Sequence, residues 1–344
     1  MSNSYQNLEE TFRKLNNIRS AAGVLHWDSS VMMPKGGADI RSEQLATLSA
    51  FCHEILTDKK VPDLIAKAKT ETKKLNDWQK SNLRLMEKQY IHASAVDKKL
   101  VFEFSKAGSE SEMIWREARG ENNFKKFRPY LEKIISFVRE IADAKAKKLK
   151  CSPYDALLDQ YDPGRKSAEI DLVFDDLRKF IPDFLNKALK HQKSKKLLPL
   201  KGPFPVEKQK ELGLKVMRAI GFDFNHGRLD VSHHPFCGGT PGDVRLTTRY
   251  NESDFTSSFM GVVHETGHAM YENGLPVKWR NQPAGEALGM SIHESMSLLM
   301  EMQVARSEKF LEFAAPLIRE VFHKTGKEWE PENIYNHYTA LRGG

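Results

Sequence analysis

The sequence predicts a mainly α-helical protein with one small β-sheet, and three observations support this fold class. Apolar residues recur at helical spacing from Leu8 to Ala22. Helix breakers are scarce between Pro62 and Pro129, a window with no other proline and only two glycines. One segment, residues 243–250, alternates polar and apolar residues with the period of a β-strand.

The expected helices can be placed in chain order. The apolar face from Leu8 to Ala22 belongs to the first helix, and a second face from Leu131 to Ala142 belongs to a later one. Turn signals that would separate helices occur at Pro34-Lys-Gly-Gly37, Asp162-Pro-Gly164 and Pro199-Leu-Lys-Gly-Pro203. No internal repeat and no low-complexity tract interrupts this pattern.

The small sheet is expected next to a loop. Residues 233–242 are rich in glycine and proline and are predicted to form that loop. The strand follows, with Val244, Leu246 and Thr248 on its apolar side and Asp243 and Arg245 on its polar side.

Composition indicates an ordinary globular chain of 344 residues, with 40% hydrophobic and 10% aromatic residues. No stretch reaches the roughly 18 apolar residues that a membrane helix needs, so no membrane partner is expected. The first residues carry neither a basic nor an apolar region typical of a secretory signal. The three cysteines, Cys52, Cys151 and Cys237, are far apart and lack CxxC spacing. We therefore expect no disulfide framework, no thiolate zinc site and a cytoplasmic location.

The net charge of +7 raises the question of nucleic acid. Part of the excess lies in residues 184–206, which hold six lysines and no acidic residue. Nucleic-acid sites usually combine such charge with arginine or stacking aromatic residues. This stretch has no arginine and phenylalanine only near its ends, so a solvated helix end and loop is the favoured interpretation, and no nucleic-acid partner is expected.

The segment that indicates chemistry is His264-Glu-Thr-Gly-His268, an HExxH pattern. Residues four apart lie on one face of a helix, so His264 and His268 could present two imidazoles to one metal ion. Glu265 would lie beside them as a general base. Gly274 is a natural end for this helix. Gly267 is unfavourable inside it by about 1 kcal/mol relative to alanine, which suggests close approach of another backbone.

A catalytic zinc site needs a third protein ligand, which often comes from a following helix. Four downstream glutamates are candidates: Glu272, Glu286, Glu294 and Glu301. Glu294 ranks first because it begins an amphipathic segment after a loop long enough for chain reversal. Glu286 ranks second and Glu301 third, while Glu272 lies one turn past His268 and cannot easily fold back.

These motifs resemble those of the carboxypeptidase Taq family of metallocarboxypeptidases (peptidase family M32). His234-Pro-Phe236 resembles the family's HPF, and Asp243-Val-Arg-Leu-Thr247 resembles DxRxT. His264 to His268 matches HExxH, and His293-Glu-Ser295 resembles the start of HES/GQ. More diffuse matches, such as Leu25-His-Trp-Asp28, extend the resemblance over nearly all of the chain.

The resemblance implies a zincin-like helical metallopeptidase with its small sheet near the active-site helix. Family members use zinc or cobalt, are usually homodimeric, and remove single residues from peptide C-termini with reluctance at proline. By the resemblance, Glu294 is the third metal ligand beside His264 and His268, and Glu265 is the general base. The chain is then expected to be a single peptidase domain over residues 1–344, with a helical region at 1–200 and a metal-site region at 201–344.

Two departures from the family pattern stand out. Met296 occupies the fourth position of HES/GQ, where the family usually has glutamine, and a thioether orients a ligand poorly. The family's IRxxAD and GxxQDxHW motifs are not found before Gly344. The expectation is a chain that lacks the C-terminal portion, and the alternative function is a metal-binding helical protein without turnover.

Several residues near these motifs are expected to contact the substrate or to support the metal ligands: His234, Asp243, Arg245, Thr247 and His293. A carboxypeptidase needs a cation to bind the terminal carboxylate, and arginine suits this by its fork geometry. For Arg245, Arg249 and Arg280 a structural ion pair is favoured over a substrate contact. His293 is expected to be a supporting or core histidine and not a fourth ligand.

Overall fold

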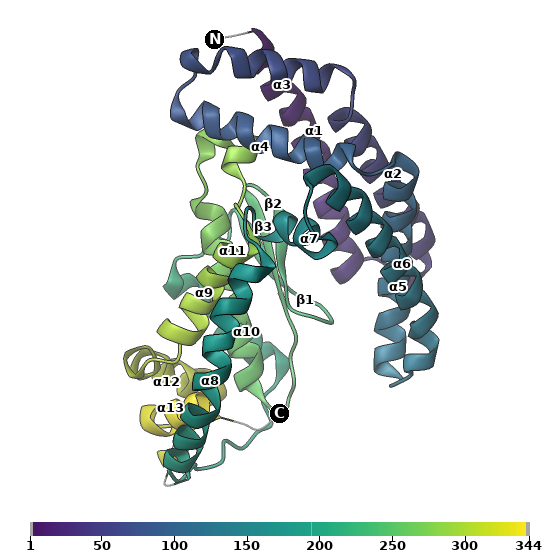
Figure 1. Cartoon of the computed structure of the whole chain (residues 1–344). Helices are drawn as coiled ribbons and strands as arrows, with labels where there is room; N and C mark the ends of the chain where they lie inside the picture. Colours follow the sequence, from purple (N-terminus) through teal and green to yellow (C-terminus); the bar gives the residue numbers. More distant parts are fainter. Residues whose placement is uncertain (1–2, 194, 342–344) are drawn as a thin grey trace. The chain divides into compact units, whose positions relative to one another are not determined.

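The computed structural model describes residues 3–193 and 195–341 of the chain (Figure 1). Over these residues the chain forms 13 α-helices and three short strands. The predicted fold class, mainly α with one small sheet, is therefore confirmed. The chain divides into two compact units, and each is described by itself below.

The first unit comprises residues 1–164, 238–241 and 274–289. Its α-helices are α1 (Asn3–Val31), α2 (Ala38–Leu56), α3 (Lys60–Thr70), α4 (Asp77–Ser94), α5 (Lys98–Gly120), α6 (Phe124–Leu149) and α7 (Pro153–Tyr161). Short 3₁₀ turns lie at Lys35–Gly37, Thr72–Lys74, Val277–Trp279 and Pro283–Gly285.

The core of the first unit is built on the apolar face predicted for the first helix. Leu8, Phe12 and Leu15 of α1 are buried there against residues of α3 and α4 such as Ile65 and Met86. A capping box at Asn76 begins α4, because its side chain accepts the backbone N–H of Gln79. The capping side chains of Asn76 and Gln79 therefore determine where α4 begins, and packing in the core determines which face of α4 is buried.

The second unit comprises residues 165–237, 242–273 and 290–344. Its α-helices are α8 (Ser167–Gln192), α9 (Val206–Ile220), α10 (Phe255–Gly274), α11 (Met290–Leu298), α12 (Glu308–Phe322) and α13 (Pro331–Thr339). A π-helical segment, η5 (Leu299–Val304), continues α11, and a 3₁₀ turn lies at Lys327–Trp329.

The sheet has three strands, β1 (Gly227–Val231), β2 (Cys237–Thr240) and β3 (Asp243–Thr248), in the order β1-β3-β2. β1 and β3 are parallel, in a register that pairs Gly227 with Val244 and Val231 with Thr248. The predicted strand at 243–250 is confirmed as β3. The prediction of a continuous loop at 233–242 is wrong, because Cys237–Thr240 forms β2, which hydrogen bonds to β3.

Helix α10 lies between two apolar clusters of the second unit. Phe259 and Val263 pack into a cluster with residues of α9, α12 and α13. Val262 packs into a second cluster with Val244 and Leu246 of β3. The sheet therefore lies against the helix that carries HExxH, as the sequence predicted.

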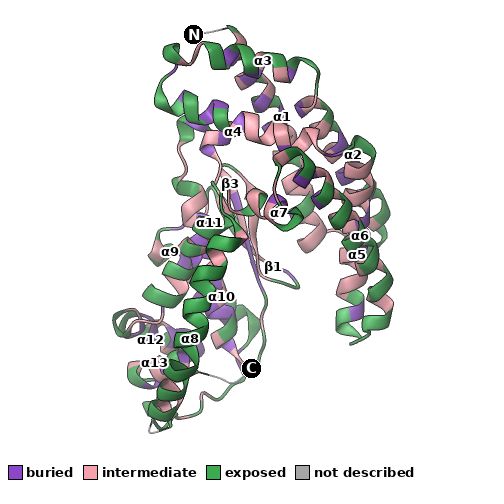
Figure 2. Ribbon diagram, in the orientation of Figure 1, coloured by how far each residue is buried: buried purple, intermediate pink, exposed green. Residues whose placement is uncertain are grey.

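Helix α8 differs from the other long helices, since it has no buried residue (green in Figure 2). Its apolar side chains, including Leu172, Phe174 and Phe180, are exposed. Within the described part of the chain, no helix is both long and apolar enough to cross a lipid bilayer.

Candidate metal centre

The site is built on α10, whose position is fixed by its cap and by its packing. The Asp254 side chain accepts the backbone N–H of Thr256, as an N-cap residue does. Two faces of the helix are buried in the clusters described above. His264 and His268 lie on a remaining face one turn apart, with the side chain of His264 21% exposed and that of His268 10% exposed.

Glu294 of α11 completes a group of three metal-ligating side chains. One ligand atom from each of His264, His268 and Glu294 lies within 4.8 Å of the others. The Glu294 carboxylate oxygens are 3.8 Å from Nε2 of His264 and 3.3 Å from Nε2 of His268. Donors around a tetrahedral zinc ion with bonds of about 2.0–2.2 Å are about 3.3–3.5 Å apart. Two imidazoles and one carboxylate gathered within 4.8 Å of one another are a donor set that suits a zinc ion.

Gly267 allows α11 to approach α10 at this point. A Cβ at position 267 would lie 2.7 Å from the backbone oxygen of Met296 and 2.7 Å from Cα of Ser297. These are backbone atoms two and three residues after Glu294, so they cannot rotate away as a side chain would. The expected close approach of another backbone at Gly267 is confirmed.

Glu301 orients the first histidine and does not join the ligand group. Its Oε2 lies 3.0 Å from Nδ1 of His264, and its Oε1 lies 2.7 Å from the Arg306 guanidinium. A carboxylate only accepts, so Nδ1 of His264 donates, and in the neutral ring Nε2 keeps a lone pair on the side of Glu294. This bond is also the main cause that raises the pKa of His264 above its usual value. The side chain comes from the π-helical segment η5, a geometry that is frequent at functional sites.

A chain of two hydrogen bonds, through His293 to Glu272, orients His268 in the way that Glu301 orients His264; we call each of these arrangements a relay. Nδ1 of His268 lies 2.6 Å from Nδ1 of His293, and Nε2 of His293 lies 2.7 Å from the Glu272 carboxylate. Because Glu272 accepts from Nε2 of His293, a neutral His293 ring accepts at Nδ1. His268 therefore donates from Nδ1, and its Nε2 is left with a lone pair. Burial lowers the pKa of His268, which keeps this ring neutral and able to bind a metal.

Glu265 lies next to His264 on α10, beside the candidate ligands, in a buried position with 5% of its surface exposed. Burial raises its pKa to about 7, and the negative charge of Glu294 adds to this, while nearby His264 opposes it. A carboxylate with such a pKa holds a proton more readily than an exposed glutamate does. The position and the basicity both suit a proton-transferring group.

Comparison with known proteins identifies the family. The model of the carboxypeptidase Taq (M32) metallopeptidase family matches residues 7–344. The chain belongs to this family. It is 35% identical over 337 residues to thermostable carboxypeptidase 1 of Thermus thermophilus and 32% identical over 302 residues to carboxypeptidase 1 of Bacillus subtilis. These alignments cover 94% and 88% of this chain but only 65% and 60% of the two relatives.

Solved structures agree with the M32 assignment. Metallocarboxypeptidase 1 of Trypanosoma cruzi superposes with a TM-score of 0.90 at 35% identity, over 99% of this chain and 68% of that one. A Pyrococcus furiosus carboxypeptidase superposes with a TM-score of 0.86 at 31% identity, over 98% of this chain and 68% of that one. The fold of the M32 relatives thus extends over almost the whole chain, which spans about two thirds of their length.

The remaining residues that the sequence singled out in this M32 chain form a structural network on β3. The Thr247 hydroxyl accepts the backbone N–H of Phe236 and lies 2.7 Å from the Ser232 hydroxyl, which also reaches the backbone oxygen of His234. Thr247 is fully buried, whereas the His234 side chain is exposed. Arg245 pairs with Asp243 at 2.6 Å. The hydrogen bonds of Thr247 and Ser232 fix the HPF segment to the sheet, whereas the Asp243–Arg245 pair lies within β3.

The other arginine and glutamate candidates are not members of the group of three side chains. Arg249 and Arg280 are exposed. Glu286, the second candidate for third ligand, belongs to the first unit and accepts a hydrogen bond from Gln89 at 3.3 Å.

Sequence reasoning missed the relay partners of the two histidines. Glu272 was set aside as a ligand because it follows His268 on the same helix, and its role toward His293 was not foreseen. No spacing signal pointed to Arg306, because residues five apart do not share a face of a regular α-helix, and here they meet through the π-helical segment η5. Burial raises the pKa of the Cys237 thiol, and the negative charges of Glu265 and Glu272 add to this less strongly.

Proposed function

We propose that this chain is a metal-dependent carboxypeptidase that hydrolyses single residues from the C-termini of peptides. Zinc is the proposed metal, with cobalt as the alternative. The observation that carries the proposal is the convergence of His264, His268 and Glu294 within 4.8 Å in a member of a metallocarboxypeptidase family. A site of two histidines and one glutamate is the ligand set of well-known zinc peptidases.

The proposed mechanism assigns each side chain one task. A bound zinc ion would supply a Lewis acid that polarises the scissile carbonyl and acidifies water. His264 and His268 would hold the ion through Nε2, since Glu301 and His293 occupy their Nδ1 atoms. Glu265 would accept a proton from the attacking water and deliver it to the leaving amine.

The supporting residues are proposed to act through structure. The Asp243–Arg245 pair and the hydroxyl of Thr247 would hold β3 and the HPF segment in place. His234, whose side chain is exposed next to them, is the member of this set proposed to contact the peptide. His293 is proposed as the residue that orients His268 and not as a ligand.

Further properties are proposed on the family resemblance and on composition. We propose a cytoplasmic homodimer that acts on peptides and has no membrane or nucleic-acid partner. We also propose that the chain works as one peptidase domain, in which residues 1–200 form a helical region and residues 201–344 carry the metal site.

The test combines metal analysis with peptide hydrolysis. Purified wild type should bind one zinc or cobalt ion per chain and release the last residue of an N-terminally blocked peptide, but not of the same peptide with a C-terminal amide. Glu265→Gln should keep the metal and lose most of the activity, by a factor of about 10²–10⁴. Glu312→Gln is the matched control, because Glu312 is exposed on α12 and pairs only with Lys309 among the described residues.

Two results would contradict the proposal. Absence of stoichiometric metal would remove the assignment of the three ligands. Full activity of Glu265→Gln would remove the general-base role. Metal binding without turnover on any peptide would support the alternative, a metal-binding helical protein, and would end the peptidase proposal for this chain.

A further inference from the structure

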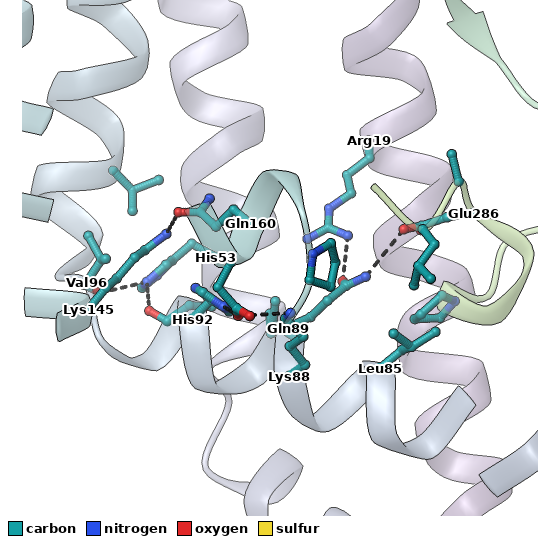
Figure 3. Close-up of a pocket in the computed structure, with 18 residues that line it drawn as sticks. Arg19, His53, Leu85, Lys88, Gln89, His92, Val96, Lys145, Gln160 and Glu286 are labelled. Atoms are coloured by element: carbon teal, nitrogen blue, oxygen red, sulfur yellow. Dashed lines mark hydrogen bonds and ion pairs between the residues drawn. The ribbon is translucent and has the colours of Figure 1, made fainter. Parts of the chain in front are cut away.

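The first unit contains a cavity of about 350 Å³ that none of the metal-site residues lines. Its walls come from α1, α2, α4, α5, α6 and α7, from the loop residues Val96 and Pro163, and from residues 283–288 (Figure 3). This volume lies at the lower end of the range for small-molecule sites, about 300–1,000 Å³. The lining mixes leucine, valine, alanine and proline side chains with a few polar groups, which is also typical of ligand sites.

Lys145 is the unusual polar group of this cavity. Only 7% of its surface is exposed, and its ammonium donates to the side-chain oxygen of Gln160. Among the described residues no carboxylate lies within ion-pair distance of Lys145. Burial lowers its pKa to about 8, the direction expected for an ammonium that is taken out of water without a counter-charge.

The carboxylates of the cavity already have other partners. Asp159 accepts from Lys88 at 2.9 Å and from Nε2 of His92 at 2.8 Å. Glu286 accepts from Gln89, whose side-chain oxygen in turn accepts from Arg19 at 2.8 Å. Figure 3 shows Lys145 and Gln160 apart from this Arg19, Gln89 and Glu286 group. Lys145 and Arg19 are thus the two lining cations without a carboxylate at ion-pair distance among the described residues, and Lys145 is the buried one of the two.

Two histidines that line the cavity, His53 and His92, each have a ring nitrogen that can accept a hydrogen bond but receives none. Nε2 of His53 lies 3.0 and 2.8 Å from the backbone oxygens of Ala93 and Val96, so it carries a hydrogen and donates. Nε2 of His92 donates to Asp159, and burial lowers the pKa of His92, which favours its neutral ring. Nδ1 of both rings is then an acceptor, and both Nδ1 atoms are buried with no hydrogen-bond partner in the described part of the chain.

We propose that this cavity binds a small organic carboxylate that also carries an N–H or O–H donor. The carboxylate pairs with the ammonium of Lys145, and the donor bonds to Nδ1 of His53 or to Nδ1 of His92, the two lining acceptors that lack a partner. The apolar lining accommodates a short aliphatic side chain. An amino acid and a 2-hydroxy acid share this chemistry, and both are small enough for the cavity.

The experiment uses the zinc-loaded full chain and four probes: L-leucine, L-lactate, propanoate and inorganic phosphate. Binding is measured by ligand-observed NMR at about 10 mM, ten times a Kd of about 1 mM. Acetylation of individual lysines is followed by mass spectrometry with and without each probe. We expect L-leucine, L-lactate or both to bind and to slow acetylation of Lys145 about tenfold while that of Lys147 is unchanged.

Three variants locate the binding. Lys145→Met keeps the aliphatic length and should weaken binding at least tenfold. Lys147→Met is the matched control, since Lys147 is exposed on the same helix, and it should bind as wild type does. Glu294→Ala removes a metal-site residue and should also bind as wild type does, which separates this site from the proposed peptidase site.

The outcomes decide the proposal without reference to peptide hydrolysis. Propanoate lacks the hydroxyl group of lactate, so weaker binding of propanoate supports the need for an N–H or O–H donor. Tighter binding of leucine than of lactate would indicate an amino acid as the ligand, and the reverse order would indicate a 2-hydroxy acid. The proposal is overturned if no probe binds, if Lys145→Met binds as wild type does, or if only phosphate protects Lys145. Loss of binding in Glu294→Ala would place the ligand in the metal centre and would also overturn it.

Discussion

Replacing Gly267 by alanine should loosen the metal centre without removing any ligand. The new Cβ would lie 2.7 Å from the Met296 oxygen and 2.7 Å from Cα of Ser297, while ordinary contacts begin at 3.4 Å. The backbone of α11 must therefore move by about 0.7 Å, or α10 must move by as much. Glu294, two residues before Met296, moves with α11.

Two magnitudes follow from this displacement. Overpacking costs about 1–3 kcal/mol, and the upper end applies because both contacted atoms are backbone. Alanine recovers about 1 kcal/mol of helix propensity, so Gly267→Ala should lower the free energy of unfolding of the metal-free protein by about 2 kcal/mol. Metal–ligand distances tolerate only about 0.2 Å, so zinc affinity should fall by about 10–100-fold.

Gly261→Ala is the matched control on the same helix. Its nearest neighbour would be the Thr248 hydroxyl at 3.8 Å, an ordinary contact, so this variant should be neutral or slightly stabilised. Urea unfolding of the metal-free proteins gives the stability, and competition with a chromophoric chelator gives the zinc affinity. If Gly267→Ala matched Gly261→Ala in both measurements, the argument that Gly267 sets the α10–α11 spacing would be refuted.

Three further predictions address other parts of the structure. Glu301→Ala removes the acceptor that fixes the ring of His264, so zinc affinity in the chelator assay should fall about 10–100-fold. If Glu301→Ala bound zinc as tightly as the control Glu312→Ala, the role of Glu301 in orienting His264 would be contradicted. Asp254→Ala removes the cap of α10 and should cost about 1 kcal/mol in urea unfolding; no loss would contradict the capping role. Burial alone would raise the pKa of Asp159, but its hydrogen-bond and ion-pair partners outweigh this and lower the pKa from 3.8 to about 2. The stabilisation from Asp159 is therefore present above about pH 4 and lost as pH falls through 2. Asp159→Asn should therefore cost about 1–2 kcal/mol at pH 7, after allowance for partial solvent screening, and almost nothing at pH 2; a penalty independent of pH would contradict the ion-pair explanation.

The elements that the sequence predicted well are those with a local physical signal. The apolar face of α1, with Leu8 and Phe12, shows its helical period directly. Strand β3 alternates, and Gly274 ends α10 as expected. The HExxH spacing itself places His264 and His268 on one face of a helix.

The elements that it missed depend on contacts between distant segments. Cys237–Thr240 contains two glycines and only one β-branched residue, so β2 exists because of its pairing and not because of its propensity. Strand β1 was likewise not foreseen, since its hydrogen bonds come from β3 across a connection in the chain. Short strands of this kind are determined by tertiary structure.

The metal centre shows the same division between local and distant information. The ranking that put Glu294 before Glu301 rested on chain reversal and helix spacing. Both side chains do face α10, but only distances could assign Glu294 to Nε2 and Glu301 to Nδ1 of His264. The relay through His293 and Glu272 depends on ring orientations, which no residue spacing specifies.

The most direct test of the proposed metal centre is an anomalous difference map from zinc-loaded crystals, recorded on both sides of the zinc absorption edge. The geometry predicts one strong peak per chain, within about 2.0–2.2 Å of Nε2 of His264, Nε2 of His268 and a carboxylate oxygen of Glu294. Glu301 should remain bonded to Nδ1 of His264 without touching the metal. A map without a peak at these three residues, or with zinc bound by Glu301 in place of Glu294, would contradict the account.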